Sequence, residues 1–137
     1  MLRIFKRFFK EDKTAKVEPR MYLVLREDLA YKYIQGAHAL AQFSNYHISK
    51  FTEWGNKYLI CLSTFNGLTL QKEHEKIISV HIDLMLEHKV PNRKAGLYFE
   101  AFIEPDLRST LPTAIAVYED GRGIVQRTLS HLNLATK

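Results

Sequence analysis

Residues 21–41, MYLVLREDLAYKYIQGAHALA, decide the fold. The continuous apolar run Tyr22–Leu25 is typical of a β-strand that is buried on both faces. Helical periodicity follows from about Ile34 to Ser49, so this stretch joins a strand to a helix. At about 100° per residue, an apolar and a polar set of positions separate on the helix. We expect the apolar set to pack on the sheet. The apolar set is Ile34, Ala37, Leu40, Ala41 and Ile48. The polar set is Gln35, His38, Gln42 and Asn45.

Strands and helices continue to alternate along the rest of the chain. After the first helix we expect a buried strand, a long helix with Thr69 as its N-cap, two further strands, a short helix and a final apolar segment. The expected bounds are Lys57–Leu62 and Leu70 to about His88, then strands at Gly96–Ile103 and Thr113–Tyr118, and lastly the apolar segment Leu132–Leu134. This alternation predicts an α/β fold: three layers, α/β/α, around a four-stranded mixed sheet.

Length and composition are those of one globular domain. The chain has 137 residues, of which 46% are apolar, and this is enough for a single core. We assign residues 21–137 to that domain and residues 1–20 to a basic amphipathic tail, Met1–Lys10, with a polar linker. So short a tail would anchor the chain to a membrane only weakly. Packing on the body or on a partner is therefore the favoured interpretation of it.

Charge and cysteine content limit the kinds of partner and the cellular compartment that we expect for this chain. No apolar run approaches the roughly 20 residues needed to span a bilayer, and no signal peptide is evident, so we expect no integral membrane association. The single cysteine, Cys61, cannot form an internal disulfide, which is typical of a cytoplasmic protein. The net charge of +5 favours polyanions such as RNA, DNA or acidic lipid.

Several chemistries lack the motifs that they need. His74, His81 and His88 recur every seven residues, so neighbours on a helix would lie about 10.5 Å apart, too far to share one ion. We expect a structural role for them and no metal. The nucleophile elbow, the phosphate-binding loop and the dinucleotide fingerprint are all missing from the sequence, so no cofactor is expected.

A polar constellation remains at the junction between the first strand and the first helix. It consists of Arg26, Asp28, Lys32, Gln35 and His38. Open α/β sheets place their ligands at the carboxyl ends of their strands, which is where these side chains are expected to lie. The constellation is therefore the candidate site, although a histidine in such a place is more often a surface or capping residue.

These residues resemble the type II peptidyl-tRNA hydrolases, the archaeal and eukaryotic kind. That family has a strand ending in basic-x-Asp-Leu, a helix carrying Gln-Cys-Ser-His-Ala, a fourth strand starting with Thr and a short apolar run, and a Val-Thr-Gly-x-Leu-Lys-Leu end. The matching segments here are Arg26-Glu27-Asp28-Leu29, Gln35-Gly36-Ala37-His38-Ala39, Thr113-Ala114-Ile115-Ala116 and, loosely, Leu129–Leu134. The order and spacing of the elements agree from about Tyr22 to Leu134.

The sequence departs from the family pattern in two places. The family lysine stands where this chain has Tyr31, and Lys32 is displaced from it by one position. The family's Asp-Ala-Gly-x-Thr segment is replaced by Phe102-Ile103-Glu104-Pro105-Asp106-Leu107. Glu104 takes the place of the family aspartate if about three residues are deleted before Thr113, whereas Ala101 takes it if the alignment has no gap.

The resemblance implies hydrolysis of the ester that joins a peptide to the 3′ ribose of tRNA. The general base would be His38 or a carboxylate from Glu104 or Asp106, and Lys32 would stabilise the oxyanion or hold a phosphate. Arg26, Asp28, Gln35 and Thr113 would orient the site and the substrate. Basic residues would contact the tRNA backbone: Lys57, Arg93, Lys94 and Arg108.

All of these roles require the imidazole of His38 and the acidic turn at Glu104–Asp106 to face one water-accessible hollow. A non-catalytic RNA- or protein-binding module on the same fold is the alternative, because a fold does not guarantee an activity. A third alternative is a partner-dependent protein that docks through Met1–Lys10. The oligomeric state is open, with a homodimer as one alternative.

Overall fold

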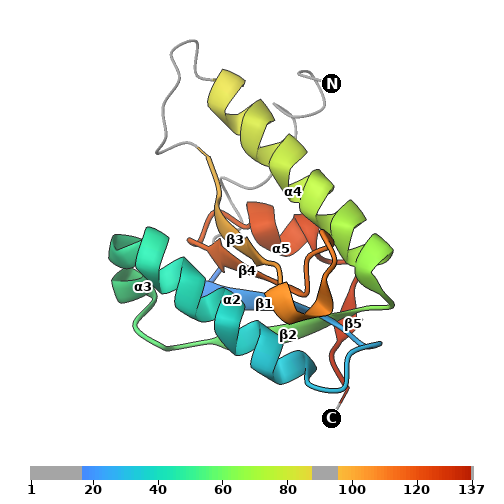
Figure 1. The fold of residues 1–137 in the computed structure, drawn as a ribbon. Helices are drawn as coiled ribbons and strands as arrows, with labels where there is room; N and C mark the ends of the chain where they lie inside the picture. Colours follow the sequence, from blue (N-terminus) through green and yellow to red (C-terminus); the bar gives the residue numbers. More distant parts are fainter. Residues whose placement is uncertain (1–16, 88–95, 137) are drawn as a thin grey trace.

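The computed structural model describes residues 17–87 and 96–136, and these form one mixed β-sheet with helices packed against it (Figure 1). The strand order is β3-β4-β1-β2-β5. β1 and β2 pair in parallel. The other three pairs, β4 with β1, β3 with β4 and β5 with β2, are antiparallel. The strands are β1 Arg20–Arg26, β2 Leu59–Thr64, β3 Tyr98–Phe102, β4 Ala114–Glu119 and β5 Asn133–Leu134.

The predicted α/β class and the mixed sheet are confirmed, but the sheet has five strands and not four. The additional strand, β5, comes from the final apolar segment of the chain. Its two residues pair with the end of β2, with Leu134 opposite Leu62 and Asn133 opposite Ser63. Two residues are too few to show the alternation of apolar and polar positions that marks a strand in a sequence.

The helices are α2, α3, α4 and α5, and a 3₁₀ turn, η2, precedes β4. Their bounds are α2 Lys32–Tyr46, α3 Ile48–Trp54, α4 Gly67–Glu87, η2 Pro105–Leu107 and α5 Ile124–Thr128. The single helix predicted from Ile34 to Ser49 is thus two helices, which meet at His47 at an angle (Figure 1). The backbone of His47 has φ −132° and ψ 53°, outside the helical region, and this ends α2. No helix among the described residues is long and apolar enough to cross a membrane.

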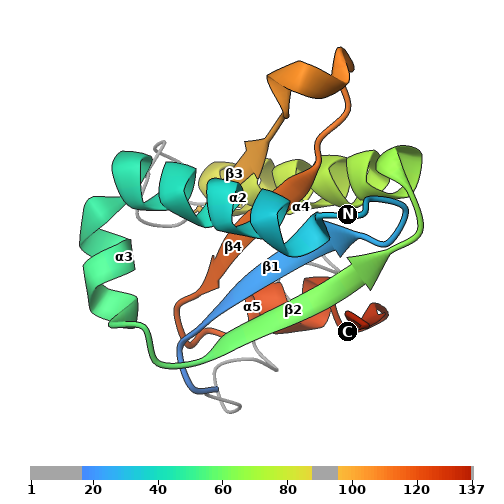
Figure 2. The ribbon, with the colours of Figure 1, turned by 60° about the horizontal axis from the view of Figure 1, so that its bottom comes forward.

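Two apolar cores lie on opposite faces of the sheet, because side chains alternate along each strand. Tyr22 and Val24 of β1 point into a core shared with α4 and α5. Met21, Leu23 and Leu25 point into the other core, which contains residues of α2 and α3. Figure 2 shows the sheet with α2 on one side and α5 on the other. β1 is buried on both faces, as predicted, with all five residues from Met21 to Leu25 buried.

The face of α2 that packs on the sheet differs from the predicted one. Ile34 and Ile48 are 53% and 64% exposed, whereas Gly36, Ala39 and Phe43 are buried. A Cβ atom on Gly36 would lie 2.8 Å from Cδ2 of Leu25. The helix therefore packs closely on the sheet at Gly36. The prediction of the buried face used only the spacing of apolar residues and took no account of where the small glycine allows close packing.

Strand directions bring five chain segments to one edge of the sheet. β3 runs in the same direction as β1 and β2, because it is antiparallel to β4 and β4 is antiparallel to β1. The carboxyl ends of β1, β2 and β3 therefore meet the amino ends of β4 and β5 at this edge, which we call the carboxyl edge. The first turns of α2 and α4 follow β1 and β2 there. The predicted site residues all lie in segments that reach or adjoin this edge.

Candidate functional site

Four residues from three separate segments meet at the carboxyl edge on the α2 side. The hydroxyl oxygen of Thr113 lies 2.9 Å from Oε1 of Gln35 and 3.1 Å from the carbonyl oxygen of Phe102. The ring of His38 stacks on the ring of Phe102, with centroids 4.9 Å apart and an interplanar angle of 15°. His38 itself is exposed. We call Gln35, His38, Phe102 and Thr113 the α2-side cluster; it joins α2 to the end of β3 and the start of β4.

Arg26 is held rigidly at the end of β1. Its Nε and Nη2 donate to the two carboxylate oxygens of Asp28, at 3.0 and 2.8 Å. Its Nη1 donates to the carbonyl oxygen of Pro112 at 3.2 Å. The hydrogen bonds from Arg26 hold the pKa of Asp28 below its ordinary value. A Cβ atom on Gly67 would lie 3.0 Å from Nη1 of Arg26, so the guanidinium also touches the start of α4.

Lys32 is buried, with 8% of its surface exposed, and its ammonium group is already paired. It forms an ion pair with the carboxylate of Glu27 and donates to the hydroxyl of Thr136 at 2.8 Å. The hydrogen bond from Lys32 is the largest reason why the pKa of Glu27 falls to about 2. The structure thus places Lys32 against Thr136, which follows β5 in the chain. Tyr31, at the position of the family lysine, is exposed.

The acidic turn after β3 lies at the same edge. Glu104 caps the turn η2 by accepting a hydrogen bond of 3.4 Å from the backbone N–H of Asp106. Asp106 is exposed and Glu104 is half-buried. Figure 2 shows this turn projecting away from the sheet. Phe102, on which the ring of His38 stacks, is two residues before Glu104 in the chain. Of the expected tRNA-contacting residues, Lys57 and Arg108 are exposed, and Arg93 and Lys94 lie outside the described residues.

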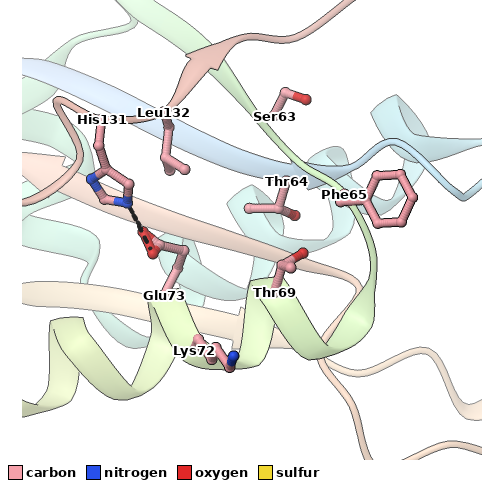
Figure 3. Close-up of a pocket in the computed structure, with 8 residues that line it drawn as sticks. All are labelled: Ser63, Thr64, Phe65, Thr69, Lys72, Glu73, His131 and Leu132. Atoms are coloured by element: carbon pink, nitrogen blue, oxygen red, sulfur yellow. Dashed lines mark hydrogen bonds and ion pairs between the residues drawn. The ribbon is translucent and has the colours of Figure 1, made fainter.

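A pocket on the α4 side of the carboxyl edge contains none of the predicted site residues. Its volume is about 320 Å³. It lies between the end of β2, the first turns of α4 and the segment after α5 (Figure 3). The lining residues are Ser63, Thr64, Phe65, Thr69, Lys72, Glu73, His131 and Leu132.

An ion pair between His131 and Glu73 lies at one end of this pocket (Figure 3). Nε2 of His131 contacts both carboxylate oxygens of Glu73, one of them at 3.1 Å. Glu73 is buried, and His131 lies 58 positions further along the chain. No local motif links two residues so far apart in sequence, so sequence reasoning had no signal for this pair. The sequence predicts the loop at Phe65 from local residues, but it does not predict the proximity of this loop to His131.

Asn66, and not Thr69, caps α4. Oδ1 of Asn66 accepts a hydrogen bond of 3.0 Å from the backbone N–H of Thr69. In return, the hydroxyl of Thr69 accepts one of 2.8 Å from the backbone N–H of Asn66. This reciprocal pair is a capping box that begins three residues earlier than the predicted cap.

The histidines of α4 serve packing. Nδ1 of His81 accepts a hydrogen bond of 2.8 Å from the backbone N–H of Leu97. The rings of His74 and His81 contact the ring of Phe99 edge-on, at 6.0 and 5.4 Å between centroids. His88 lies outside the described residues. Within the described ranges, no group of three or more His, Cys, Asp or Glu side chains is arranged to hold a metal ion. Cys61 is half-buried in β2, and burial raises the pKa of its thiol.

The carboxyl edge therefore carries two chemically different places. The α2-side cluster offers an exposed imidazole that could take a proton and an amide that could donate a hydrogen bond. The pocket beside α4 offers a hollow that is open to solvent, with one flanking lysine, Lys72. Neither a protein-family model nor a curated protein sequence matches this chain.

Proposed function

We propose that this chain hydrolyses the ester bond of peptidyl-tRNA, on a three-layer α/β/α body in the cytoplasm. The observation that carries the proposal is the contact between Thr113 and Gln35, 78 positions apart, at 2.9 Å. Each belongs to a different segment that resembles the type II peptidyl-tRNA hydrolases. Two separately matched segments thus converge on one hydrogen bond, with the exposed ring of His38 one helical turn from Gln35.

The reaction requires a base, an activated water and a hydrogen-bond donor for the oxyanion. His38 takes a proton from water, and the water oxygen attacks the ester carbonyl carbon. The bond from that carbon to the ribose oxygen then breaks, the ribose oxygen takes the proton from His38, and the peptide leaves as a carboxylic acid that loses its remaining proton to solvent water. Stacking on Phe102 uses the face of the imidazole, so its two nitrogens remain at the ring edge, where they can reach water.

Gln35 is the better donor for the oxyanion than Lys32. Oε1 of Gln35 is engaged by Thr113, which directs its Nε2 amide group to other acceptors. The ammonium group of Lys32 is buried between Glu27 and Thr136, and these bonds would have to break before it could act. In this proposal, Lys32 positions the first turn of α2, and Arg26 and Asp28 fix the adjoining loop.

The test is deacylation of an N-acetylated aminoacyl-tRNA by the purified full chain. We expect turnover in the wild type and a loss of about a hundredfold in the rate for His38→Ala, because the base is removed. Asn45→Ala is the matched control, since Asn45 is also exposed on α2, two turns further along. A folded wild type without turnover, or a His38→Ala variant as fast as Asn45→Ala, would contradict the proposal.

The second candidate is an RNA-binding module without catalysis. The observation that favours it is that Tyr31 stands at the position of the family lysine, while the ammonium group of the neighbouring Lys32 is buried in an ion pair with Glu27. Binding of tRNA that weakens steeply with salt, without any ester cleavage, would distinguish the module from the enzyme.

A further inference from the structure

The pocket beside α4 lies next to a topological switch point of the sheet, on the side of β2 that faces β5. After β1 the chain crosses to α2, on one face, and after β2 it crosses to α4, on the opposite face. Connections that leave two neighbouring parallel strands in opposite directions open a crevice at their carboxyl ends. Ligands of open α/β sheets bind at the carboxyl ends of the strands, and the pocket lies at the end of β2, beside Thr64, between α4 and the segment after α5.

Phe65 provides a flat apolar wall that is open to solvent. Its side chain is 77% exposed, although it lies directly at the pocket. Leu132 is half-buried on the other side. In Figure 3, His131 and Phe65 lie at opposite ends of the pocket, with Thr64 and Thr69 between them. A planar ring stacked on Phe65 would cover an aromatic surface that is otherwise left in water.

The threonine hydroxyls of the pocket have already used their protons. Thr64 donates to the carbonyl oxygen of Leu25 at 2.7 Å, and Thr69 donates to the carbonyl oxygen of Asn66 at 2.8 Å. A hydroxyl has one proton and two lone pairs, so each can offer a ligand only an acceptor. Thr69 has one lone pair left for this, because its oxygen already accepts from the backbone N–H of Asn66. The pocket therefore favours ligands with N–H donors over ligands with carbonyl groups at the same place.

Lys72 provides the positive charge of the pocket. It is exposed, and it has no hydrogen bond or ion pair with any other residue in the described part of the chain. The other basic group, His131, is bound to the buried carboxylate of Glu73. An anionic group would therefore be held at Lys72, at the first turns of α4.

We propose that this pocket binds one unpaired nucleotide of RNA whose base carries an exocyclic amino group. The base stacks on Phe65, its amino group donates to the hydroxyl oxygens of Thr64 and Thr69, and a phosphate contacts Lys72. The volume of about 320 Å³ lies at the lower end of the range of small-molecule pockets, as suits a single nucleotide. The inference rests on the RNA-binding part of the proposed function and adds the nucleotide class that is recognised. Unpaired bases stacked on aromatic side chains are the usual basis of sequence-selective RNA binding.

The experiment is a titration of the full chain with AMP, CMP and UMP, followed by amide resonances and by calorimetry. We expect AMP and CMP to shift resonances of the pocket residues and to bind at least about threefold more tightly than UMP. A trinucleotide of A and C should bind more tightly than either monomer, whereas equal affinity would point to free nucleotides and contradict an RNA ligand. Equal affinity for UMP and AMP, or an absence of shifts at the pocket, would overturn the proposal.

Two substitutions at exposed positions test the assigned contacts. Phe65→Ala should weaken binding of the trinucleotide by about tenfold or more, because stacking on the ring is lost. Lys72→Ala should weaken it and flatten its dependence on salt. Leu68→Ala is the matched control, since Leu68 is 64% exposed in the same segment but does not line the pocket. A loss for Leu68→Ala equal to that for Phe65→Ala would contradict a specific pocket.

The outcomes separate this inference from the proposed activity. Ester cleavage that depends on His38, with no effect of Phe65→Ala on RNA binding, would remove the nucleotide pocket and leave the hydrolase. Nucleotide binding that depends on Phe65, in a folded protein that cleaves no ester, would do the reverse.

Discussion

The ammonium group of Lys32 and the hydroxyl group of Thr136 are joined by a hydrogen bond of 2.8 Å across 104 positions of sequence. Glu27 completes the arrangement, because its carboxylate also accepts from the backbone N–H of Thr136 at 3.1 Å. The hydroxyl of Tyr33 donates to the carbonyl oxygen of Thr136 at 2.6 Å. The C-terminal residues are thus fastened to the first turn of α2, and the lysine that could serve chemistry serves this attachment.

Lys32→Met should lower the free energy of unfolding by about 1 to 3 kcal/mol at pH 7, because it leaves Glu27 without its cation in a partly buried place. Lys57→Met, at an exposed lysine, should change it by less than about 0.5 kcal/mol. Denaturant unfolding followed by circular dichroism measures both. Equal values for the two variants would show that the buried pair contributes nothing.

The same pair predicts a dependence of stability on acid. The pKa of Glu27 is about 2 in the folded protein, well below its ordinary value of 4.5. The folded state therefore binds its proton less readily than the unfolded state, and the stabilisation is present above about pH 4.5 and lost as the pH falls toward 2. Unfolding measured between pH 5 and pH 2 should show a shallower decline in Lys32→Met than in the wild type. Parallel curves would exclude this cause.

Burial of the α4 histidines predicts a second pH effect, near neutrality. Burial lowers the pKa of His74 and of His81 below the ordinary 6.5. The unfolded chain then binds more protons than the folded one at mildly acidic pH, so stability should rise from pH 5 to pH 7.5. His81→Gln should reduce this rise, as measured by thermal or denaturant unfolding at both pH values. An unchanged rise would mean that other groups cause it.

Gly36→Ala should destabilise the protein by about 1 kcal/mol, although alanine favours helices. The added Cβ would lie 2.8 Å from Cδ2 of Leu25, which is fully buried and cannot move aside cheaply. Overpacking of about 1 to 3 kcal/mol then exceeds the gain in helix propensity of about 1 kcal/mol. Ala37→Ser, on the exposed side of α2, should be nearly neutral in the same unfolding assay. A stabilised Gly36→Ala variant would contradict the close approach.

Glu119→Gln should cost about 1 to 3 kcal/mol, because the buried carboxylate accepts three backbone hydrogen bonds, two from the turn before α5 and one from α5 itself. The donors are the N–H groups of Gly121, Gly123 and Gln126, at 2.9, 3.0 and 3.0 Å. An amide turns its own NH2 group toward at least one of these N–H donors and leaves that donor unpaired. Glu18→Gln, at an exposed position, is the control. If the unfolding curves of the two variants coincide, the carboxylate of Glu119 does not stabilise the turn.

Elements whose signal is local were predicted from the sequence nearly as they occur. β1, β4 and α4 combine apolar runs or long periodicity with clear boundaries, and each lies within a few residues of its expected place. β2 begins two residues later than expected and ends two residues later, at Thr64. Its first residues, from Lys57, continue the loop after Gly55, because strand pairing with β1 begins opposite Met21.

The candidate site was predicted less completely than the fold. The residues of the α2-side cluster were visible as polar positions near strand ends, and the fold brings Gln35 and Thr113 together. The burial of Lys32 was not visible, because its partners Glu27 and Thr136 come from separate ends of the domain. The pocket at Phe65 was also missed, since Glu73 and His131 meet only when the segment after α5 packs beside α4.

By itself, the sequence determined the α/β class, the mixed sheet and the positions of the long elements, because hydrophobic periodicity and turn residues act over a few neighbouring residues. Tertiary structure alone decided the fifth strand, the face of α2 that meets the sheet, the partner of Lys32 and the pocket beside α4. Each of these depends on contacts between residues that are distant in the chain, and such contacts are selected by the packing of the whole domain and leave no pattern in any one segment.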